Sequence, residues 1–215
     1  MTLLDKFDFK KEFKRLYLPK TEPHLVEVPP MTFIAVEGKG NPNDDTGEYS
    51  EAVGLLYALS YTIKMSYKGG RAIDGYFEYV VLPLEGLWWS EDGKLEIDFS
   101  DKSLFRWVSM IRQPEFVTED VFRWACEEVA IKKKLDTSRA KLLQYDEGLC
   151  VQCMHIGSYD DEPATVSKMN AFMHQHGYRF DDSGIRRHHE IYLGDPRKTA
   201  PEMLKTVIRH PVTSV

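Results

Sequence analysis

The chain has 215 residues, of which 28 are Lys or Arg and 34 are Asp or Glu, so its formal net charge is −6 at pH 7. This acidic excess argues against general attraction to nucleic acid, because such binding depends on Lys and Arg that neutralise phosphates. With 42% hydrophobic and 12% aromatic residues, the composition is that of a globular protein and excludes a largely disordered chain.

Three features of the sequence indicate a cytoplasmic protein. Its apolar stretches, such as residues 52–59, are much shorter than the roughly 20 residues that span a bilayer, and residues 1–19 lack the uninterrupted apolar stretch of a signal peptide. The three cysteines, Cys126, Cys150 and Cys153, are odd in number and do not suggest a disulfide framework. We therefore expect a reducing compartment and no membrane partner.

The first half of the chain carries mainly strand patterns around one long helix. The helix is indicated by apolar residues three or four positions apart, and the strands by branched and aromatic runs between turn residues. The predicted elements are a strand at 31–37, a helix at 48–67, a strand at 75–89 interrupted by Pro83, and strands at 94–99 and 104–112.

The second half carries clearer start and stop signals. Thr118 is a helix N-cap residue, and Pro163 suits the first turn of a helix that ends at Gly177. The predicted elements are a helix at 118–134, a hairpin at 141–157 that turns at 146–148, a helix from about residue 160 to 177, a strand at 188–194, and a short helix through residue 208 opened by a capping box at 199–202.

The two halves repeat the same order of elements. The paired segments are "FIAVEG" with "CMHIG" and "GYFEYVVLP" with "HHEIYLGDP", each pair flanking a helix. We expect pseudo-repeats at about 24–112 and 139–212, linked by the helix at 118–134, within one domain of residues 1–215. The predicted fold is α+β: duplicated strand-helix-strand-strand repeats that form an antiparallel sheet, with helices outside and a central ligand cleft.

The Cys and His residues of the sequence are not spaced in the way that metal ligands usually are. Cys150 and Cys153 form a CxxC, but positions three apart in a strand point to opposite faces, so we interpret both as buried structural residues. The histidine pairs at 174/176 and 188/189 diverge for the same kind of reason. Common nucleotide, serine-hydrolase and zinc-protease motifs are missing from the sequence. We therefore expect no metal site and no cofactor.

Glu190 is the most informative acidic residue. In "HHEIYLG", alternation places His188, Glu190 and Tyr192 on one face of a strand. Two interpretations stay open: a solvated stripe on an edge strand, or a carboxylate on the floor of a cleft, where it serves as a base or as a partner for a cation. Glu78, at the corresponding place in the first half, raises the same question.

Aromatic side chains in nearly every predicted element are the second ingredient of a ligand cleft. Trp88 and Trp89 point to opposite faces of a strand, so a single core absorbs only one of them easily. The further candidates for binding, some of which are expected to be ordinary core residues, are Phe33, Tyr57, Trp124, Tyr145 and Tyr192.

Four segments, "PPMTFIAVEGKGNPND", "PLEGLWW", "GSYDDEPATVSKM" and "HHEIYLGDPRKTAPEMLKTVIRHPV", together resemble the GyrI-like small-molecule-binding family over nearly the whole chain. That family is similar to the effector-binding domains of multidrug-responsive transcription activators. The resemblance implies binding of flat, aromatic and often cationic compounds, with Glu190 as the carboxylate of the cleft. It also implies aromatic walls from Trp88, Trp89, Tyr145 and Tyr192. Because no helix-turn-helix segment precedes residue 31, we expect no direct contact with nucleic acid.

The resemblance leaves an enzyme and a binding protein as alternatives. Proteins that consist of this domain alone resemble a subfamily that hydrolyses cyclopropanoid DNA-alkylating compounds. Glu190 would then activate water, and Tyr145 or Tyr192 would donate a hydrogen bond to the carbonyl that gains charge. The alternative is a non-catalytic module that sequesters aromatic cations or regulates a protein partner such as DNA gyrase, with Glu190 as counter-charge. A third hypothesis is an interaction domain whose aromatics are all core.

Overall fold

The computed structural model of the protein describes residues 6–91, 102–181 and 183–215. The helices are α1 (Phe9–Glu12), α2 (Lys14–Tyr17), α3 (Glu48–Lys64), α4 (Glu119–Lys133) and α5 (Glu162–Gln175). The strands are β1 (His24–Val28), β2 (Met31–Lys39), β3 (Leu84–Ser90), β4 (Phe105–Arg112), β5 (Ala140–Tyr145), β6 (Gly148–Ile156), β7 (Tyr178–Phe180), β8 (His188–Tyr192) and β9 (Lys205–Ser214).

The described strands form one antiparallel sheet in the order β1-β6-β9-β8-β3-β4-β2-β5, with β7 paired to β9. The strands β3 and β8 pair at its centre. Beside β3 lie β4 and then β2, and beside β8 lie β9 and then β6. Each half thus contributes a strand, a helix (α3 or α5) and two more strands in the same spatial order, which confirms the duplicated α+β fold.

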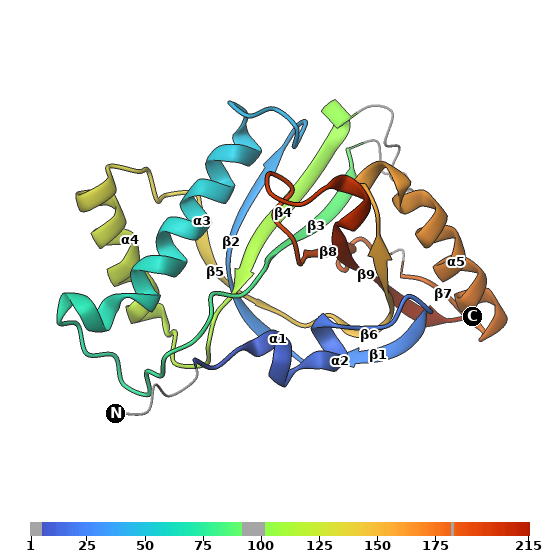
Figure 1. The fold of residues 1–215 in the computed structure, drawn as a ribbon, viewed down its shortest axis with the longest axis horizontal. Helices are drawn as coiled ribbons and strands as arrows, with labels where there is room; N and C mark the ends of the chain where they lie inside the picture. The colour runs from blue at the N-terminus through green and yellow to red at the C-terminus, as the bar shows by residue number, and fades with distance from the viewer. Residues whose placement is uncertain (1–5, 92–101, 182) are drawn as a thin grey trace.

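The helices α3 and α5 lie on the same face of the sheet, on either side of the central strands β3 and β8 (Figure 1). We call this the helix face. The short helices α1 and α2 lie against the opposite face, where the hydroxyl of Tyr17 is 3.5 Å from Oε1 of Glu85. We call this the N-terminal face. Along every central strand, successive side chains alternate between these two faces.

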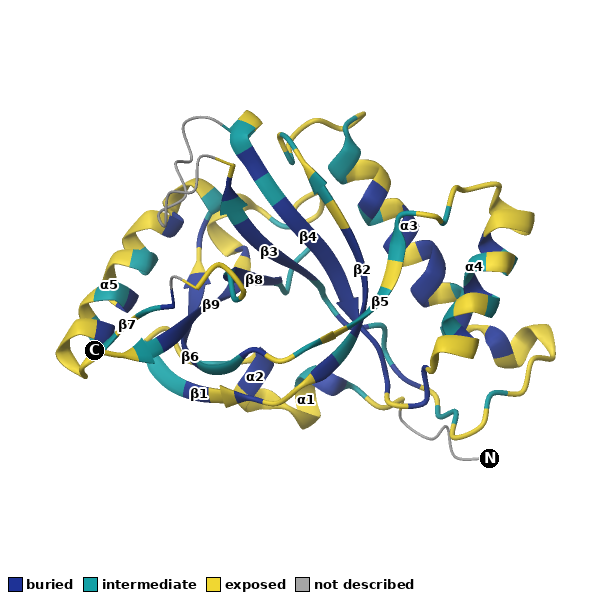
Figure 2. Ribbon diagram, turned by 180° about the vertical axis from the view of Figure 1, so that it is seen from behind, coloured by how far each residue is buried: buried dark blue, intermediate teal, exposed yellow. Residues whose placement is uncertain are grey.

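The buried hydrophobic residues form two clusters, of which the larger extends over both faces of the sheet. The larger one includes Cys150, and the smaller one joins Cys153 to Met169 and Met173 of α5. Cys153 thus packs on the helix face, and alternation along β6 turns Cys150 to the N-terminal face, so the two thiols point to opposite faces, as their spacing predicts. The middle strands β3, β4 and β2 are mostly buried along their length (Figure 2), so residues at the centre of the sheet have little access to water.

Most predicted elements are confirmed, with small shifts at their ends. Strand β2, helices α3, α4 and α5, and strands β4 and β8 lie where the sequence places them. Thr118 caps α4 by accepting a hydrogen bond from the backbone N–H of Val121, and Pro163 lies in the first turn of α5. The strand predicted at 94–99 lies outside the described residues.

Three predictions about local structure are wrong. Residues 75–83 are not a regular strand: their backbone makes an isolated bridge to Phe7, and regular pairing starts only after Pro83, which has no N–H to donate. Glu78 is consequently exposed and is not the counterpart of Glu190, since β3 occupies that place in the sheet.

The other two errors concern the second half. Residues 141–157 are two strands but no hairpin, because β5 pairs with β2 whereas β6 pairs with β1 and β9. The predicted helix through residue 208 is only a 3₁₀ turn at Pro201–Met203, followed by the long strand β9. The β-branched run Thr206, Val207 and Ile208 favours that strand over a helix.

Candidate functional site

Strand β8 places Glu190 at the centre of the sheet. Glu190 pairs with Gly86 of β3 on one side and with Ile208 of β9 on the other, and its side chain is only 7% exposed. A solvated stripe on an edge strand is therefore excluded. On the same face, Nε2 of His188 lies 2.9 Å from Oε1 of Glu190, as the alternation of β8 predicts.

Aromatic rings surround this carboxylate on the helix face. The indole N–H of Trp88 donates a 2.9 Å hydrogen bond to the hydroxyl of Tyr192. Tyr49 of α3 packs on Trp88 with ring centroids 5.5 Å apart, and Tyr159, just before α5, packs edge-on to Tyr192 at 5.7 Å. Rings from both halves of the chain thus meet at the seam between β3 and β8.

Gly86 makes this packing of rings possible. A Cβ atom at Gly86 would lie 2.5 Å from Nε1 of Trp88 and 3.1 Å from the hydroxyl of Tyr192. Gly38 of β2 has the same role beside Trp107 of β4, because a Cβ atom there would collide with the indole ring. The two glycines leave room for indole rings to lie flat over the backbone.

A second carboxyl group, Glu162 in the first turn of α5, faces Glu190. Glu162 is fully buried, no N–H or hydroxyl group of the described residues donates to its carboxylate oxygens, and its hydrogen-bond neighbour is the carboxyl group of Glu190. Burial, with the neighbouring charge of Glu190 as a further cause, raises the pKa of Glu162 well above its usual value. Burial and Glu190 likewise raise the pKa of Tyr159 to about 12 and that of Tyr192 well above 10, so both tyrosines keep their protons near neutral pH.

The opposite side of β8 is fixed by a buried charge network on the N-terminal face. His189 contacts Oε1 of Glu147 at 2.8 Å and Oε2 of Glu85 at 3.0 Å, and Arg209 lies 3.3 Å from Glu147. Burial by itself would lower the pKa of His189, but the two carboxylates outweigh it and raise that pKa to about 9. Because His189 is held on both ring nitrogens, β8 and the residues beside it have a fixed orientation.

The structure brings three of the predicted site residues together: Glu190, Trp88 and Tyr192. Tyr57 lies on α3 on the same side of the sheet and is 36% exposed. Burial is the main cause that raises the pKa of Tyr57, and the charges of Asp195 and Arg197, in the loop after β8, also affect this pKa. Tyr57 is therefore at the border of the site and not at its centre.

The structure separates the remaining candidates from Glu190. Phe33 is fully buried, and it pairs with Arg112 in the register that points to the N-terminal face. Tyr145 packs against His189 on that face, with centroids 6.5 Å apart. Trp89 also points there, and Arg187 covers its ring at 4.8 Å. Trp124 lies on α4 beside Arg71, beyond α3.

Sequence reasoning missed three residues of this cluster, Tyr49, Tyr159 and Glu162, and it noted Trp107 among the aromatics without assigning it to the site. Glu162 follows two aspartates at a helix start, where acidic residues are common for reasons of helix stability alone. The useful signal was present in "GSYDDEP", because this segment belongs to the family-like motifs and contains both Tyr159 and Glu162.

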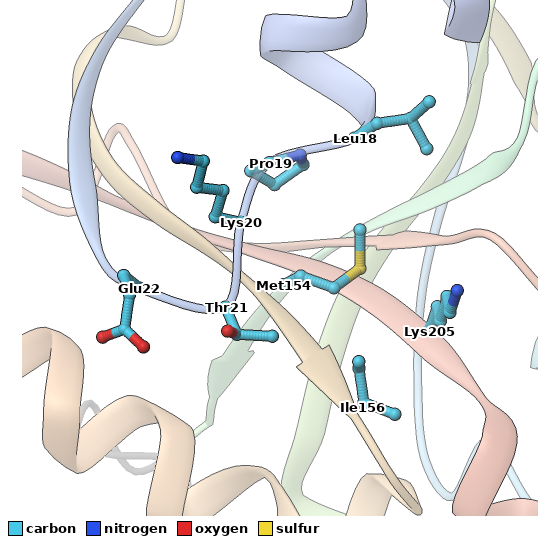
Figure 3. A pocket seen from close by; sticks show the side chains of 8 residues that line it. All are labelled: Leu18, Pro19, Lys20, Thr21, Glu22, Met154, Ile156 and Lys205. Carbon is cyan, nitrogen blue, oxygen red and sulfur yellow. The ribbon is translucent and has the colours of Figure 1, made fainter.

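A surface hollow exists elsewhere, between the segment after α2 and the ends of β6 and β9 (Figure 3). Its lining residues are Leu18, Pro19, Lys20, Thr21, Glu22, Met154, Ile156 and Lys205. This lining contains no aromatic ring and none of the predicted site residues. We therefore place the candidate site at Glu190 and not at this hollow.

Comparison with known protein families matches residues 21–213 to the GyrI-like small molecule binding domain. A search of curated proteins gives no match. Among solved structures, a hydrolase from Listeria innocua is 49% identical with a TM-score of 0.87, and the alignment covers 97% of this chain and 100% of that chain. An uncharacterized conserved protein from Listeria innocua is 51% identical with a TM-score of 0.90 and the same coverage.

A more distant structure shares the fold alone. The EcmrR C-terminal domain is 14% identical with a TM-score of 0.52, over 90% of this chain and 98% of that chain. No helix among the described residues is both long and apolar enough to cross a membrane. With a family match over almost its entire length and close similarity to the Listeria structures, the chain belongs to the GyrI-like family of small-molecule-binding domains.

Proposed function

We propose that this protein binds planar aromatic molecules at the cluster on the helix face and hydrolyses cyclopropanoid DNA-alkylating compounds there. The proposal depends on one arrangement: the buried carboxylate of Glu190 shares its face with Trp88 and Tyr192, which are joined by a 2.9 Å hydrogen bond. Rings supply a stacking surface, and a shielded carboxylate supplies a base. The description of Listeria structures as hydrolases supports the catalytic role.

The roles follow from the hydrogen bonds. Glu190 accepts a proton from a water molecule, whose oxygen bonds to a cyclopropane carbon as the strained C–C bond breaks. The electron pair of that bond moves into the conjugated carbonyl, whose oxygen gains negative charge. Tyr192 accepts a hydrogen bond from Trp88, and its own O–H donates to Glu190. Once Glu190 has accepted the proton of the water, this O–H is free to donate to the carbonyl oxygen instead. Tyr145, on the other face of β8, cannot take this role.

The second candidate function is binding without chemistry. A carboxylate among aromatic rings also attracts a flat organic cation, and Glu190 would then only balance its charge. In either case we propose a cytoplasmic protein that does not bind nucleic acid directly, since its net charge is −6.

Binding is tested by titrating the protein with a rhodamine dye and following fluorescence. An aromatic site with one carboxylate is expected to give a dissociation constant in the micromolar range, or about −8 kcal/mol. No saturable change up to the solubility limit of the dye would argue against the site.

Hydrolysis is tested by incubating a cyclopropanoid compound with the protein and measuring the mass of the product. Addition of one water, faster than in buffer alone, is the result expected of an enzyme. An unchanged compound that nevertheless competes with the dye would leave binding as the function and reject catalysis.

A further inference from the structure

Three side chains of residue types that commonly bind metal ions lie close together at the centre of the site. The candidate donor atoms of Glu162, His188 and Glu190 all lie within 4.8 Å of one another, and Nε2 of His188 is 2.9 Å from Oε1 of Glu190. They come from two elements, the first turn of α5 and the strand β8. Their exposed fractions are 0%, 6% and 7%.

The burial of Glu162 beside a second carboxyl group indicates that a positively charged partner would stabilise it. A buried carboxylate without a hydrogen bond is costly, and a second carboxylate beside it adds repulsion. No N–H or hydroxyl group of the described residues donates to either oxygen of Glu162, and its one neighbour within hydrogen-bond reach is the carboxyl group of Glu190. The gap between Glu162 and Glu190 must therefore hold either a shared proton or a cation.

His188 is oriented in the way that metal-binding histidines usually are. Its Nδ1 lies 2.8 Å from Nε2 of the buried His210, so one ring nitrogen is occupied by a neighbour from β9. The other nitrogen, Nε2, points toward the two carboxylates. A ligand histidine commonly has its second nitrogen held in this manner, which fixes the ring and selects the tautomer.

We propose that Glu162, His188 and Glu190 bind one divalent transition-metal ion of the Zn²⁺ or Mn²⁺ type. One imidazole and two carboxylates suit these ions better than Ca²⁺ or Mg²⁺, which prefer oxygen ligands alone. With bonds of about 2.0–2.2 Å, ligand atoms lie roughly 3.3–3.6 Å apart around a tetrahedral ion and up to about 4.4 Å apart on opposite sides of an octahedral one. The donor atoms here lie within 4.8 Å of one another, with one pair at 2.9 Å, so shifts of about an ångström bring them to ligand distances.

This proposal does not depend on the proposed hydrolysis, because metal binding is measured without a substrate. Glu190 would bind the ion through one carboxylate oxygen, which leaves its other oxygen for the role of base. Three protein ligands leave coordination positions for water or for an oxygen of a small molecule. Along the sequence the histidines diverge from one another, and we expected no metal there, whereas the structure pairs His188 with two glutamates.

The test is calorimetric titration of chelator-treated protein with ZnCl₂, repeated with MnCl₂. We expect one ion per chain, and we expect Glu162→Gln and His188→Gln each to weaken binding at least tenfold. His174→Gln is the matched control, since His174 is an exposed histidine of α5 outside the cluster, and it should leave binding unchanged. Melting temperatures measured in chelator establish that each variant is folded.

A second measurement does not depend on the variants. Co²⁺ added to the parent protein should give a weak visible spectrum without the intense near-ultraviolet band of a cobalt–thiolate bond, which excludes the three cysteines as ligands. The proposal is overturned if no ion binds stoichiometrically, if a thiolate band appears, or if both cluster variants bind like the parent. The shared proton is then the alternative, and Glu162→Gln, whose amide can still donate a hydrogen bond to Glu190, should melt no lower than the parent protein.

Discussion

At Glu190, one substitution separates catalysis from binding. Glu190→Gln keeps the volume of the side chain but removes its charge and basicity. If Glu190 is the base, turnover of a cyclopropanoid compound should fall about a hundredfold or more, while neutral ligands still bind. If the protein only binds ligands, the variant should bind cationic ligands less tightly by about 1 to 2 kcal/mol, relative to neutral ligands of the same shape. Equal turnover and equal cation preference in variant and parent would remove Glu190 from both functions.

Trp88 and Trp89 offer a matched pair for testing which face of β3 binds ligands. Trp88→Phe keeps a ring but removes the N–H that donates to Tyr192, so dye affinity should fall by about 0.5–1.5 kcal/mol. Trp89→Phe makes the corresponding change on the N-terminal face, beneath Arg187, and should leave dye affinity unchanged. Fluorescence titration of both variants gives the comparison. If Trp89→Phe weakened dye binding and Trp88→Phe did not, the ligand would bind on the N-terminal face and our assignment of the site to the helix face would be wrong.

Among single residues, the sequence predicts what depends on strand alternation and misses what depends on packing between distant segments. The shared face of His188, Glu190 and Tyr192 follows from a period of two, as do the opposite directions of Trp88 and Trp89. The approach of Glu162 to Glu190 depends on how α5 docks on the sheet, and no local pattern encodes that docking.

At the level of elements, the backbone of β3 must lie close to the indole of Trp88, and Gly86 permits this. Gly86→Ala would place a Cβ atom 2.5 Å from Nε1, so Trp88 and Tyr192 must move. We expect the free energy of unfolding to fall by about 1–3 kcal/mol and dye binding to weaken with it. Urea unfolding and dye titration measure the two effects.

Gly54→Ala is the matched control for this prediction. Gly54 lies on the exposed side of α3, and a Cβ atom there meets nothing within 4 Å. Alanine should therefore stabilise the protein by about 0.4–1 kcal/mol through helix propensity and reduced unfolded-state entropy. Similar losses in both variants would mean that crowding at Trp88 is not the cause.

The elements that the sequence predicts well are those with strong local signals, such as the Thr118 cap of α4 and the glycine that follows α5. The errors lie where pairing with a distant strand, and not the local sequence, determines the structure of a segment. The segment 146–148 has turn chemistry, yet the carboxylate of Glu147 points inward to His189 and Arg209, and the two flanking strands diverge to different neighbours. Tertiary pairing thus overrides a local turn preference.

For the whole molecule, the two halves are joined by more than the pairing of β3 with β8. The buried network on the N-terminal face takes Glu85 from the first half and His189, Glu147 and Arg209 from the second. If the first half unfolded alone, His189 would lose its contact with Glu85 and the packing that keeps this network together would be lost. Arg209 also donates to the backbone carbonyl of Leu16, so the N-terminal segment is tied to the same network.

We therefore predict that both halves unfold in a single transition, and the sequence supplies a separate probe for each. Three of the four tryptophans lie in the first half, and Trp124 lies on the linking helix α4, which packs against α3, so tryptophan fluorescence reports on the first half. Cys150 and Cys153 are buried in β6 of the second half, so their reaction with a thiol reagent reports on that half. In a Cys126→Ser background, which removes the less buried thiol of α4, the urea midpoints from the two probes should coincide. Thiol exposure at clearly lower urea than the loss of tryptophan signal would show that the halves are stable independently, and the buried network would then not couple them.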